Sequence, residues 1–137
     1  MNEDCIFCKI VRGEVPAEKI YEDENTLAFM DLRPVSRGHA LVIPKNHSAD
    51  FLSAQDTDLI NATKTAQKVA AAIMKGIGAS GINITSNNGS AAGQVIFHLH
   101  FHIIPRFAND GLKPWEHKES ESKTRAELAE IIKKNLA

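Results

Sequence analysis

In Val95-Ile96-Phe97-His98-Leu99-His100-Phe101-His102-Ile103-Ile104, histidines alternate with large apolar residues up to Pro105. Successive side chains of a β-strand point to opposite faces of the sheet. The pattern therefore predicts a strand over residues 95–104, with the intervening leucine, phenylalanine and isoleucine buried on one face. The three histidines then line up on the opposite face, within reach of one ligand.

Three interpretations of the aligned histidines follow from the residues alone. A solvated sheet face is one, but random placement of 6 histidines gives such a triplet only about once in a hundred chains of this length. A zinc site is the second, because imidazole is a common zinc ligand. A catalytic site is the third, because imidazole is largely neutral near pH 7 and then carries a free lone pair.

The bulk composition is that of one ordinary globular domain over residues 1–137. Hydrophobic residues make up 43% of the chain and charged residues 24%, with a net charge of −1. A balanced charge argues against nonspecific binding of nucleic acid, which requires a basic surface. The acidic start lacks an apolar signal core, and no apolar run is long enough to span a membrane. We therefore expect a cytoplasmic protein without a disulfide between Cys5 and Cys8.

Periodicity and turn residues place the other elements. Residues 56–75 form the clearest helix, because apolar positions recur every three or four residues. Its stripe consists of Leu59, Thr63, Ala66, Ala70, Ile73 and Ile77. The stripe serves either the core or an interface with a second copy. Shorter patterns predict a helix over residues 6–12, strands over 19–21, 26–30, 39–43 and 82–86, and a last helix capped by Thr124 with Glu127.

These elements together predict an α+β domain. Strands paired through turns, with one long helix between the third and the fourth, favour a five-stranded antiparallel sheet. A short N-terminal helix and a C-terminal helix complete the domain. Its core covers about residues 5–106, and residues 107–137 form a polar tail and the last helix.

A loop of small residues precedes the histidines over residues 87–94. Its backbone N–H groups could approach an anion without obstruction by Cβ atoms. The same composition suits a simple hairpin turn, so this segment alone leaves both interpretations open. The sequence lacks a Gly-x-x-x-x-Gly-Lys loop, which excludes a P-loop nucleotide site.

The run His98-Leu99-His100-Phe101-His102-Ile103-Ile104 resembles the signature of the histidine-triad (HIT) family. Further matches follow in the same order, so the similarity covers about residues 5–106. They are Asp31, the segment His39-Ala40-Leu41-Val42-Ile43-Pro44, Asn87 and Gly93-Gln94. The resemblance implies a HIT-like fold, a homodimer and a hydrolase that cleaves a phosphorus bond of a purine nucleotide.

By this resemblance His100 is the nucleophile. It would attack the α-phosphorus and form a nucleotidyl-histidine intermediate that water then hydrolyses, without a catalytic metal. His102 would contact the phosphate oxygens and stabilise the developing charge. His98 would fix the geometry of His100, and His39 would join the same hydrogen-bonded network.

The resemblance also implies the contacts to the nucleotide. Asp31 would hold the ribose hydroxyls, while Asn87, Gly93 and Gln94 would contact the phosphate or the leaving group. The base would lie against residues that otherwise suit a plain core: Ile6, Phe7, Ile10, Phe29 and Leu32. Val95 stands where many hydrolytic members carry Ser or Thr. Because valine cannot donate a hydrogen bond, we expect a lower rate or a changed leaving-group preference.

Cys5 and Cys8 have the spacing of a pair of metal ligands. A redox motif is the alternative, but it requires a thioredoxin-like context that this sequence lacks. The family resemblance implies that His47 and His98 supply the two remaining ligands of a structural zinc site.

The sequence thus predicts a nucleotide phosphoramidase or nucleotidyl hydrolase. Dinucleoside polyphosphate hydrolysis is one alternative, because Pro105-Arg106 after the strand resembles that branch of the family more than the phosphoramidase branch. A nucleotide-binding protein with vestigial catalysis is another, which Val95 keeps open. A zinc-binding structural protein is a further alternative, but it would give no role to His100, His102 and Asp31. Related nucleotidyltransferases typically carry Gln at the position of His102, so the histidine favours hydrolysis over transfer.

Overall fold

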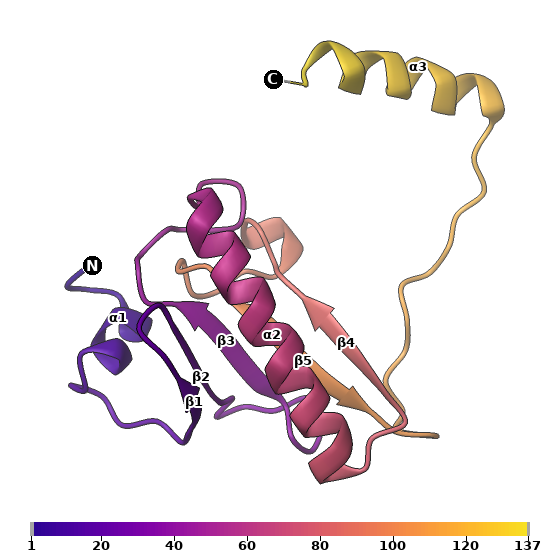
Figure 1. The fold of residues 1–137 in the computed structure, drawn as a ribbon. Coiled ribbons are helices and arrows are strands. Elements are labelled where there is room, and N and C mark those ends of the chain that lie inside the picture. The colour runs from indigo at the N-terminus through magenta and orange to yellow at the C-terminus, as the bar shows by residue number, and fades with distance from the viewer. Residues whose placement is uncertain (1, 137) are drawn as a thin grey trace.

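The computed structural model describes residues 2–136, which form three α-helices and a five-stranded antiparallel sheet (Figure 1). The elements are α1 (Ile6–Val11), β1 (Lys19–Glu22), β2 (Thr26–Met30), β3 (Ala40–Pro44), α2 (Asp56–Ile77), β4 (Gly81–Thr85), the short 3₁₀-helix η1 (Ser90–Ala92), β5 (Phe101–Arg106) and α3 (Ser122–Lys134). The strand order β1-β2-β3-β5-β4 makes β1 and β4 the edges of the sheet. The predicted α+β class is confirmed. In the described residues, no helix has both the length and the apolar composition that a bilayer crossing needs.

The two faces of the sheet carry separate apolar clusters. α2 packs over one face, where Ala28 and Val42 are buried with Ile103. α1 packs over the other face, where Phe29 and Leu41 are buried. Along β2 and β3, these residues alternate with those of the first cluster. This alternation follows from the two-residue period of a strand. His102 is the register partner of Leu41, so it belongs to the same face of the sheet, the α1 side.

The apolar stripe of α2 is part of the core of the chain. Ala66, Ala70 and Ile73 are buried against the sheet. The prediction that Thr63 belongs to this stripe is wrong, because its side chain is exposed and its hydroxyl donates to the Leu59 carbonyl. The buried threonine of α2 is Thr65, whose hydroxyl lies 2.8 Å from that of Thr26 on β2.

The strand predicted over residues 95–104 is also corrected, because β5 begins only at Phe101. Several backbone groups before it have partners outside the sheet. The Gln94 side chain donates to the Ile96 carbonyl, and the Leu99 N–H donates to the Ser48 carbonyl. Since these groups are already satisfied, residues 95–100 form an irregular segment that connects η1 to the sheet.

The C-terminal helix stands apart from the rest of the protein (Figure 1). It begins at Ser122 with Glu121 as N-cap, so the predicted capping box at Thr124 is wrong. The side chain of Arg125 donates to the carbonyl and hydroxyl of Ser120, which fixes the first turn earlier than the sequence indicates. All 13 residues of α3 are exposed.

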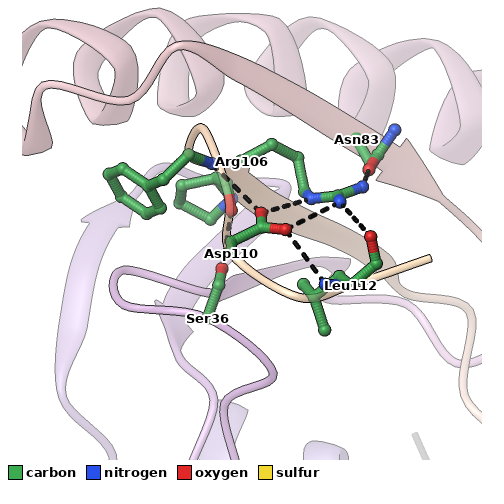
Figure 2. Close-up of polar contacts among 7 residues, drawn as sticks. Ser36, Asn83, Arg106, Asp110 and Leu112 are labelled. Atoms are coloured by element: carbon green, nitrogen blue, oxygen red, sulfur yellow. Dashed lines mark hydrogen bonds and ion pairs between the residues drawn. The ribbon is translucent and has the colours of Figure 1, made fainter. Parts of the chain in front are cut away.

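The segment that follows β5 is held at its start by one carboxylate. Figure 2 shows Arg106 between Asp110, Asn83 and the carbonyl of Leu112. Asp110 accepts from the Arg106 guanidinium at 2.8 and 3.0 Å and from the backbone N–H groups of Phe107 and Leu112. The Arg106 guanidinium and these N–H groups hold the pKa of the Asp110 carboxyl well below its usual range. This lock fixes the direction in which residues 113–121 leave the sheet.

We predict that Asp110→Ala releases the segment without unfolding the sheet. The change removes the shared acceptor of Arg106, Phe107 and Leu112, so the amides of Phe107 and Leu112 should exchange with solvent roughly tenfold faster. Hydrogen exchange followed by NMR measures this directly. Glu116→Ala, in the exposed part of the same segment, is the matched control. Unchanged exchange at both amides in Asp110→Ala would show that the carboxylate does not hold the segment.

Candidate functional site

A chain of hydrogen bonds fixes the protonated nitrogen of two imidazoles. The Val35 N–H donates to Nδ1 of His39 at 3.1 Å, so the proton of this neutral ring sits on Nε2. That N–H in turn donates to Nδ1 of His102, at 2.9 Å. His102 consequently carries its own proton on Nε2, the nitrogen that its neighbours leave free. Asp31 supports the arrangement, with Oδ2 lying 3.5 Å from His39 Nε2.

His100 is set in the opposite tautomer. Its Nδ1–H donates to the backbone carbonyl of His98 at 2.7 Å. The lone pair therefore lies on Nε2. The ring is buried, and the edge of Phe7 packs against it with centroids 5.2 Å apart. The centroid of His102 lies 4.9 Å away. The site thus sets a nitrogen lone pair beside an N–H donor.

Burial keeps these imidazoles neutral. Burial lowers the pKa of His102 to about 4, with the nearby His100 and His39 acting in the same direction. The pKa values of His100 and His39 are also lowered, first of all by burial, while the charge of Asp31 partly opposes the effect. The contact between Asp31 and His39 therefore joins a carboxylate to a neutral ring at neutral pH. A neutral ring is what a lone pair on His100 requires.

Cys5, Cys8, His47 and His98 converge next to the aligned histidines. Nδ1 of His98 lies 3.4 Å from Cys5 Sγ, 3.5 Å from Cys8 Sγ and 3.2 Å from His47 Nδ1. Cys8 Sγ lies 3.4 Å from His47 Nδ1. Ligands on a tetrahedral zinc ion, with Zn–S of about 2.3 Å and Zn–N of about 2.1 Å, are separated by about 3.4–3.6 Å for these pairs. The sulfur–nitrogen distances are close to those of a tetrahedral ligand set, and the two imidazole nitrogens lie slightly closer together than on such an ion.

The hydrogen bonds around the four atoms also fit a metal. His98 Nε2–H donates to the Pro44 carbonyl at 2.8 Å, which leaves the lone pair of Nδ1 directed at the two sulfurs. Both sulfurs accept a backbone N–H at 3.4 Å, from Asn2 on Cys8 and from Cys8 on Cys5. Such donors stabilise thiolates, and an outer partner on the ligating imidazole is usual at metal sites.

Asp31, His39 and His102 form a second group with metal-like spacing. The hydrogen bond from Val35 argues against a metal there. If His39 Nε2 bound an ion, the ring proton would move to Nδ1 and face the Val35 N–H. This group is therefore a hydrogen-bonded network, and the cysteine-containing group is the candidate metal centre.

An apolar cavity of about 230 Å³ opens beside the histidines between α1 and β2. It brings together all the residues that the family resemblance assigns to the base: Ile6, Phe7, Ile10, Phe29 and Leu32. Phe7 forms part of the wall and also contacts His100. The cavity has the size and apolar character that suit one flat heterocycle.

The loop before the histidines is clamped by Gln94. Its Oε1 accepts the Gly89 N–H at 2.9 Å, and its Nε2 donates to the Ala49 and Ile96 carbonyls at 2.7 and 3.1 Å. Both amide hydrogens are thus used inside the protein, and the Gln94 backbone N–H donates to the Gly89 carbonyl at 3.1 Å. Each N–H of Gln94 already has a partner within the loop or its surroundings, so the residue holds the loop in place. Gly93 has φ of 90°, and a Cβ there would lie 3.6 Å from Asn87 Nδ2.

Asn87 and Val95 flank the clamped loop on either side. Asn87 is half-buried, and its amide approaches the glycine turn at Gly93. The side chain of Val95 is 81% exposed. Any contact that a serine would make at this position is therefore one to solvent or ligand, and the core does not depend on it.

Comparison with known proteins identifies the fold family. The HIT domain family matches residues 12–109. The chain belongs to the HIT family. It is 45% identical over 102 residues to adenosine 5′-monophosphoramidase hnt1 of Schizosaccharomyces pombe, a match that covers 74% of each protein. It is 39% identical over 140 residues to adenylylsulfatase HINT3 of Arabidopsis thaliana, covering 99% of this chain and 71% of the relative.

Solved structures of HIT proteins share the architecture. SMU.412c of Streptococcus mutans superposes with a TM-score of 0.94 at 42% identity, covering all of this chain and 88% of that one. A zinc-bound histidine triad protein of Mycobacterium smegmatis superposes with a TM-score of 0.77 at 40% identity, covering 96% and 98% of the two chains. The predicted HIT-like fold is confirmed.

The family resemblance implies that a backbone carbonyl sets a tautomer at His98 and His100, but the sequence does not identify the backbone groups that orient the imidazoles of this HIT protein. They are the N–H of Val35 and the carbonyls of Pro44 and His98. A backbone group carries no side-chain signature, so the sequence offers no signal for its role. The family resemblance identifies Gln94 as a site residue, but the contacts by which it clamps the loop depend on a loop path that no local pattern specifies.

We predict that His102 titrates near pH 4. Because its folded pKa lies below the unfolded value of about 6.5, the unfolded chain binds more protons in that window. Stability is therefore fully present above pH 6.5 and falls as the pH drops towards 4. NMR titration of the ring checks the pKa, and thermal unfolding between pH 7 and 4.5 checks the linkage.

In His102→Asn the loss of stability on acidification should be smaller than in the parent. His117→Asn, in the exposed tail, is the matched control and should keep the parent dependence. A His102 ring that titrates near 6.5 would contradict the effect of burial.

Proposed function

We propose that the protein is a nucleotidyl hydrolase of phosphoramidase type, acting on purine nucleoside monophosphates joined to an amine or another small leaving group. The observation that carries this is the bond from His100 Nδ1–H to the His98 carbonyl, which leaves a lone pair on Nε2. The activities named for the fission yeast and Arabidopsis relatives support it. A protein that only bound nucleotide would not need this nitrogen.

In the first step, His100 Nε2 forms a bond to the α-phosphorus. The bond from phosphorus to the leaving group breaks, and its electron pair departs with the leaving group, which takes a proton from solvent. The nucleotidyl-imidazolium retains its Nδ1–H, so the His98 carbonyl faces the new positive charge. His102 Nε2–H donates to a phosphate oxygen and stabilises the charge that develops there.

In the second step, water attacks the same phosphorus. The new P–O bond forms while the N–P bond breaks, and the electron pair returns to His100 Nε2. The proton of the attacking water leaves to solvent, and the nucleoside monophosphate is released. The ring begins and ends as the same neutral tautomer, so no group of the protein changes its protonation over the cycle.

The nucleotide would lie with its base in the apolar cavity and its ribose at Asp31. Oδ1 of Asp31 accepts the Arg33 N–H at 2.8 Å, which fixes the carboxylate at the end of β2. Its lone pairs suit the two hydroxyls of a ribose. Asn87 would contact the phosphate, and Gly93, which has no Cβ, would let the phosphate approach the loop closely.

Hydrolysis of a dinucleoside polyphosphate uses the same steps with a nucleotide as the leaving group. The site is open on the side of the leaving group, since Val95 is 81% exposed. An open site accepts a larger leaving group. The assay below therefore also includes a dinucleoside polyphosphate.

We expect His100→Ala to abolish nucleotide release, by roughly a thousandfold or more, because the attacking nitrogen is lost. An adenosine phosphoramidate and a diadenosine polyphosphate are each incubated with the protein, and AMP is measured by chromatography without added metal. His117→Ala serves as the matched control and should retain full activity.

The ratio of kcat/KM for the two substrates distinguishes a phosphoramidase from a dinucleoside polyphosphate hydrolase. Release that persists in His100→Ala would exclude a covalent intermediate on this residue. A parent protein that binds AMP but cleaves neither substrate would establish nucleotide binding without catalysis.

We further propose that Cys5, Cys8, His47 and His98 hold a structural zinc ion. The spacing of the four atoms and the outer hydrogen bonds support it, as does the zinc-bound relative from Mycobacterium smegmatis. A closed set of four ligands leaves no position for substrate, so the ion would tie α1 and its N-cap Cys5 to the segment that carries His100. Cys5 and Cys8 form no disulfide, which suits the reducing cytoplasm, where we place the protein.

Protein purified without a chelator should contain about one zinc per chain by elemental analysis. Cys8→Ser should lose the metal, because a fully buried ligand is removed, whereas His117→Asn should keep it. A chelator should lower the melting temperature of the parent and leave that of Cys8→Ser unchanged. A parent protein that is metal-free and equally stable would defeat the proposal.

A further inference from the structure

The loop over residues 87–94 uses several of its own backbone N–H groups. The Gly89 N–H donates to Gln94 Oε1 at 2.9 Å, and the N–H groups of Ala92 and Gln94 both donate to the Gly89 carbonyl at 3.1 Å. The Gly93 N–H donates to the carbonyl three residues before it at 3.0 Å. Each backbone N–H is a single donor, so these four groups are not available to an anion. A phosphate at this loop therefore needs a donor from a side chain.

Asn87 offers an uncommitted amide beside the loop. Its Nδ2 lies 3.6 Å from the position that a Cβ on Gly93 would take. Among residues 2–136 the amide has no hydrogen-bond partner, and it is not one of the polar groups shut off from solvent. An amide NH₂ suits a phosphate because it provides two N–H donors. Since no bond of its own orients this amide, its direction depends on the backbone that carries it.

Asn88 fixes that backbone. Its Oδ1 accepts the Phe51 N–H at 2.8 Å, and its Nδ2 donates to the Ser86 carbonyl at 3.3 Å. The two contacts flank Asn87, because one reaches the residue before it and the other ties the residue after it to a distant part of the chain. β4 ends at Thr85, so the ladder of the sheet no longer holds these residues. The side chain of Asn88 takes over where the strand stops.

The segment that supplies the Phe51 N–H is itself held in place. The Phe51 ring packs edge-on against Phe101 of β5, with the ring centroids 6.5 Å apart. Asp50 and Ser53 bond to each other in both directions, since the backbone N–H of each donates to the side chain of the other. The Phe51 N–H is therefore a fixed donor, which can set the position of the group that accepts it.

The same segment holds the other end of the loop through separate contacts. Gln94 Nε2 donates to the Ala49 carbonyl at 2.7 Å, and the Leu99 N–H donates to the Ser48 carbonyl at 2.8 Å. Figure 1 shows η1, in the middle of the loop, beside the chain that leads into α2. Loss of the Asn88 side chain would therefore release the start of the loop and leave the segment that leads to the histidines in place.

We propose that Asn88 is a positioning residue for phosphate recognition, which directs the Asn87 amide at the phosphate of a bound nucleotide. The proposal rests on the nucleotide site proposed above. Both ends of the Asn88 amide are occupied by Phe51 and Ser86, so it acts through Asn87. The base and the ribose would be held elsewhere, in the apolar cavity and at Asp31. The effect of Asn88 is therefore confined to ligands that carry a phosphate.

Titration calorimetry with AMP and with adenosine tests this role without turnover. Asn88→Ala should weaken the affinity for AMP roughly tenfold, the effect of one hydrogen bond to a charged group, and change that for adenosine less than about twofold. Asn25→Ala, at an exposed position in the turn between β1 and β2, is the matched control and should bind both ligands like the parent. In Asn88→Ala the Phe51 amide should exchange about tenfold faster, which verifies that the contact is lost. Circular dichroism verifies that each variant is folded.

A double-mutant cycle separates positioning from an independent contribution. Asn87→Ala should weaken AMP binding by a similar factor. Adding Asn88→Ala should then cause no further loss, because the amide that it positions is already absent. Losses that multiply in the double variant, equal losses for AMP and adenosine, or an unchanged AMP affinity in Asn88→Ala would each overturn the proposal. A parent protein that binds AMP but cleaves no substrate would contradict only the proposed hydrolysis, and the affinities would still decide the role of Asn88.

Discussion

The site depends on one constraint, the single proton of a neutral imidazole. Once one nitrogen is committed to a backbone partner, the other must play the opposite role. The His98 carbonyl makes His100 a lone-pair donor, and the Val35 N–H, acting through His39, makes His102 a proton-bearing donor. Rings of the same chemistry thus acquire opposite functions from their hydrogen bonds alone. A shift of the backbone at either end would exchange the roles of the two nitrogens.

Burial supplies the second half of the constraint. An exposed imidazole is partly protonated near pH 7, and a protonated ring has no lone pair to attack with. Enclosure by α1 and the sheet lowers the pKa values of His100 and His102 and keeps both rings neutral. Phe7 contributes twice, since it packs on His100 and forms a wall of the adjoining apolar cavity. The same apolar residues therefore line the adjoining cavity and keep His100, the proposed nucleophile, neutral.

The sequence predicts the regular helices and strands of this protein. Prediction fails where other groups take the backbone hydrogen bonds that a strand would form with the sheet. Alternation and helical spacing place the strands and α2 because those patterns express burial against a flat sheet. The strand over residues 95–104 fails because Gln94 and the Ser48 carbonyl take backbone groups that a strand would pair. The four residues of the cysteine-containing cluster are separated by up to 93 positions, so only family resemblance could group them before the fold was known. Local rules fail at the site because its geometry is set by long-range contacts.

His98 joins the two centres because each of its polar groups serves a different part of the site. Its Nε2–H binds the Pro44 carbonyl, its Nδ1 faces the two cysteines, and its own carbonyl orients His100. A zinc ion bound at Nδ1 of His98 would be separated from the substrate by His98 and His100, so it would not act on the substrate directly. Its effect would be to hold the His98 ring in place, and with it the His98 carbonyl that sets the tautomer of His100, the proposed nucleophile. Loss of the ion should therefore act on the rate through the position of His100, while the chemistry of the phosphorus centre stays the same.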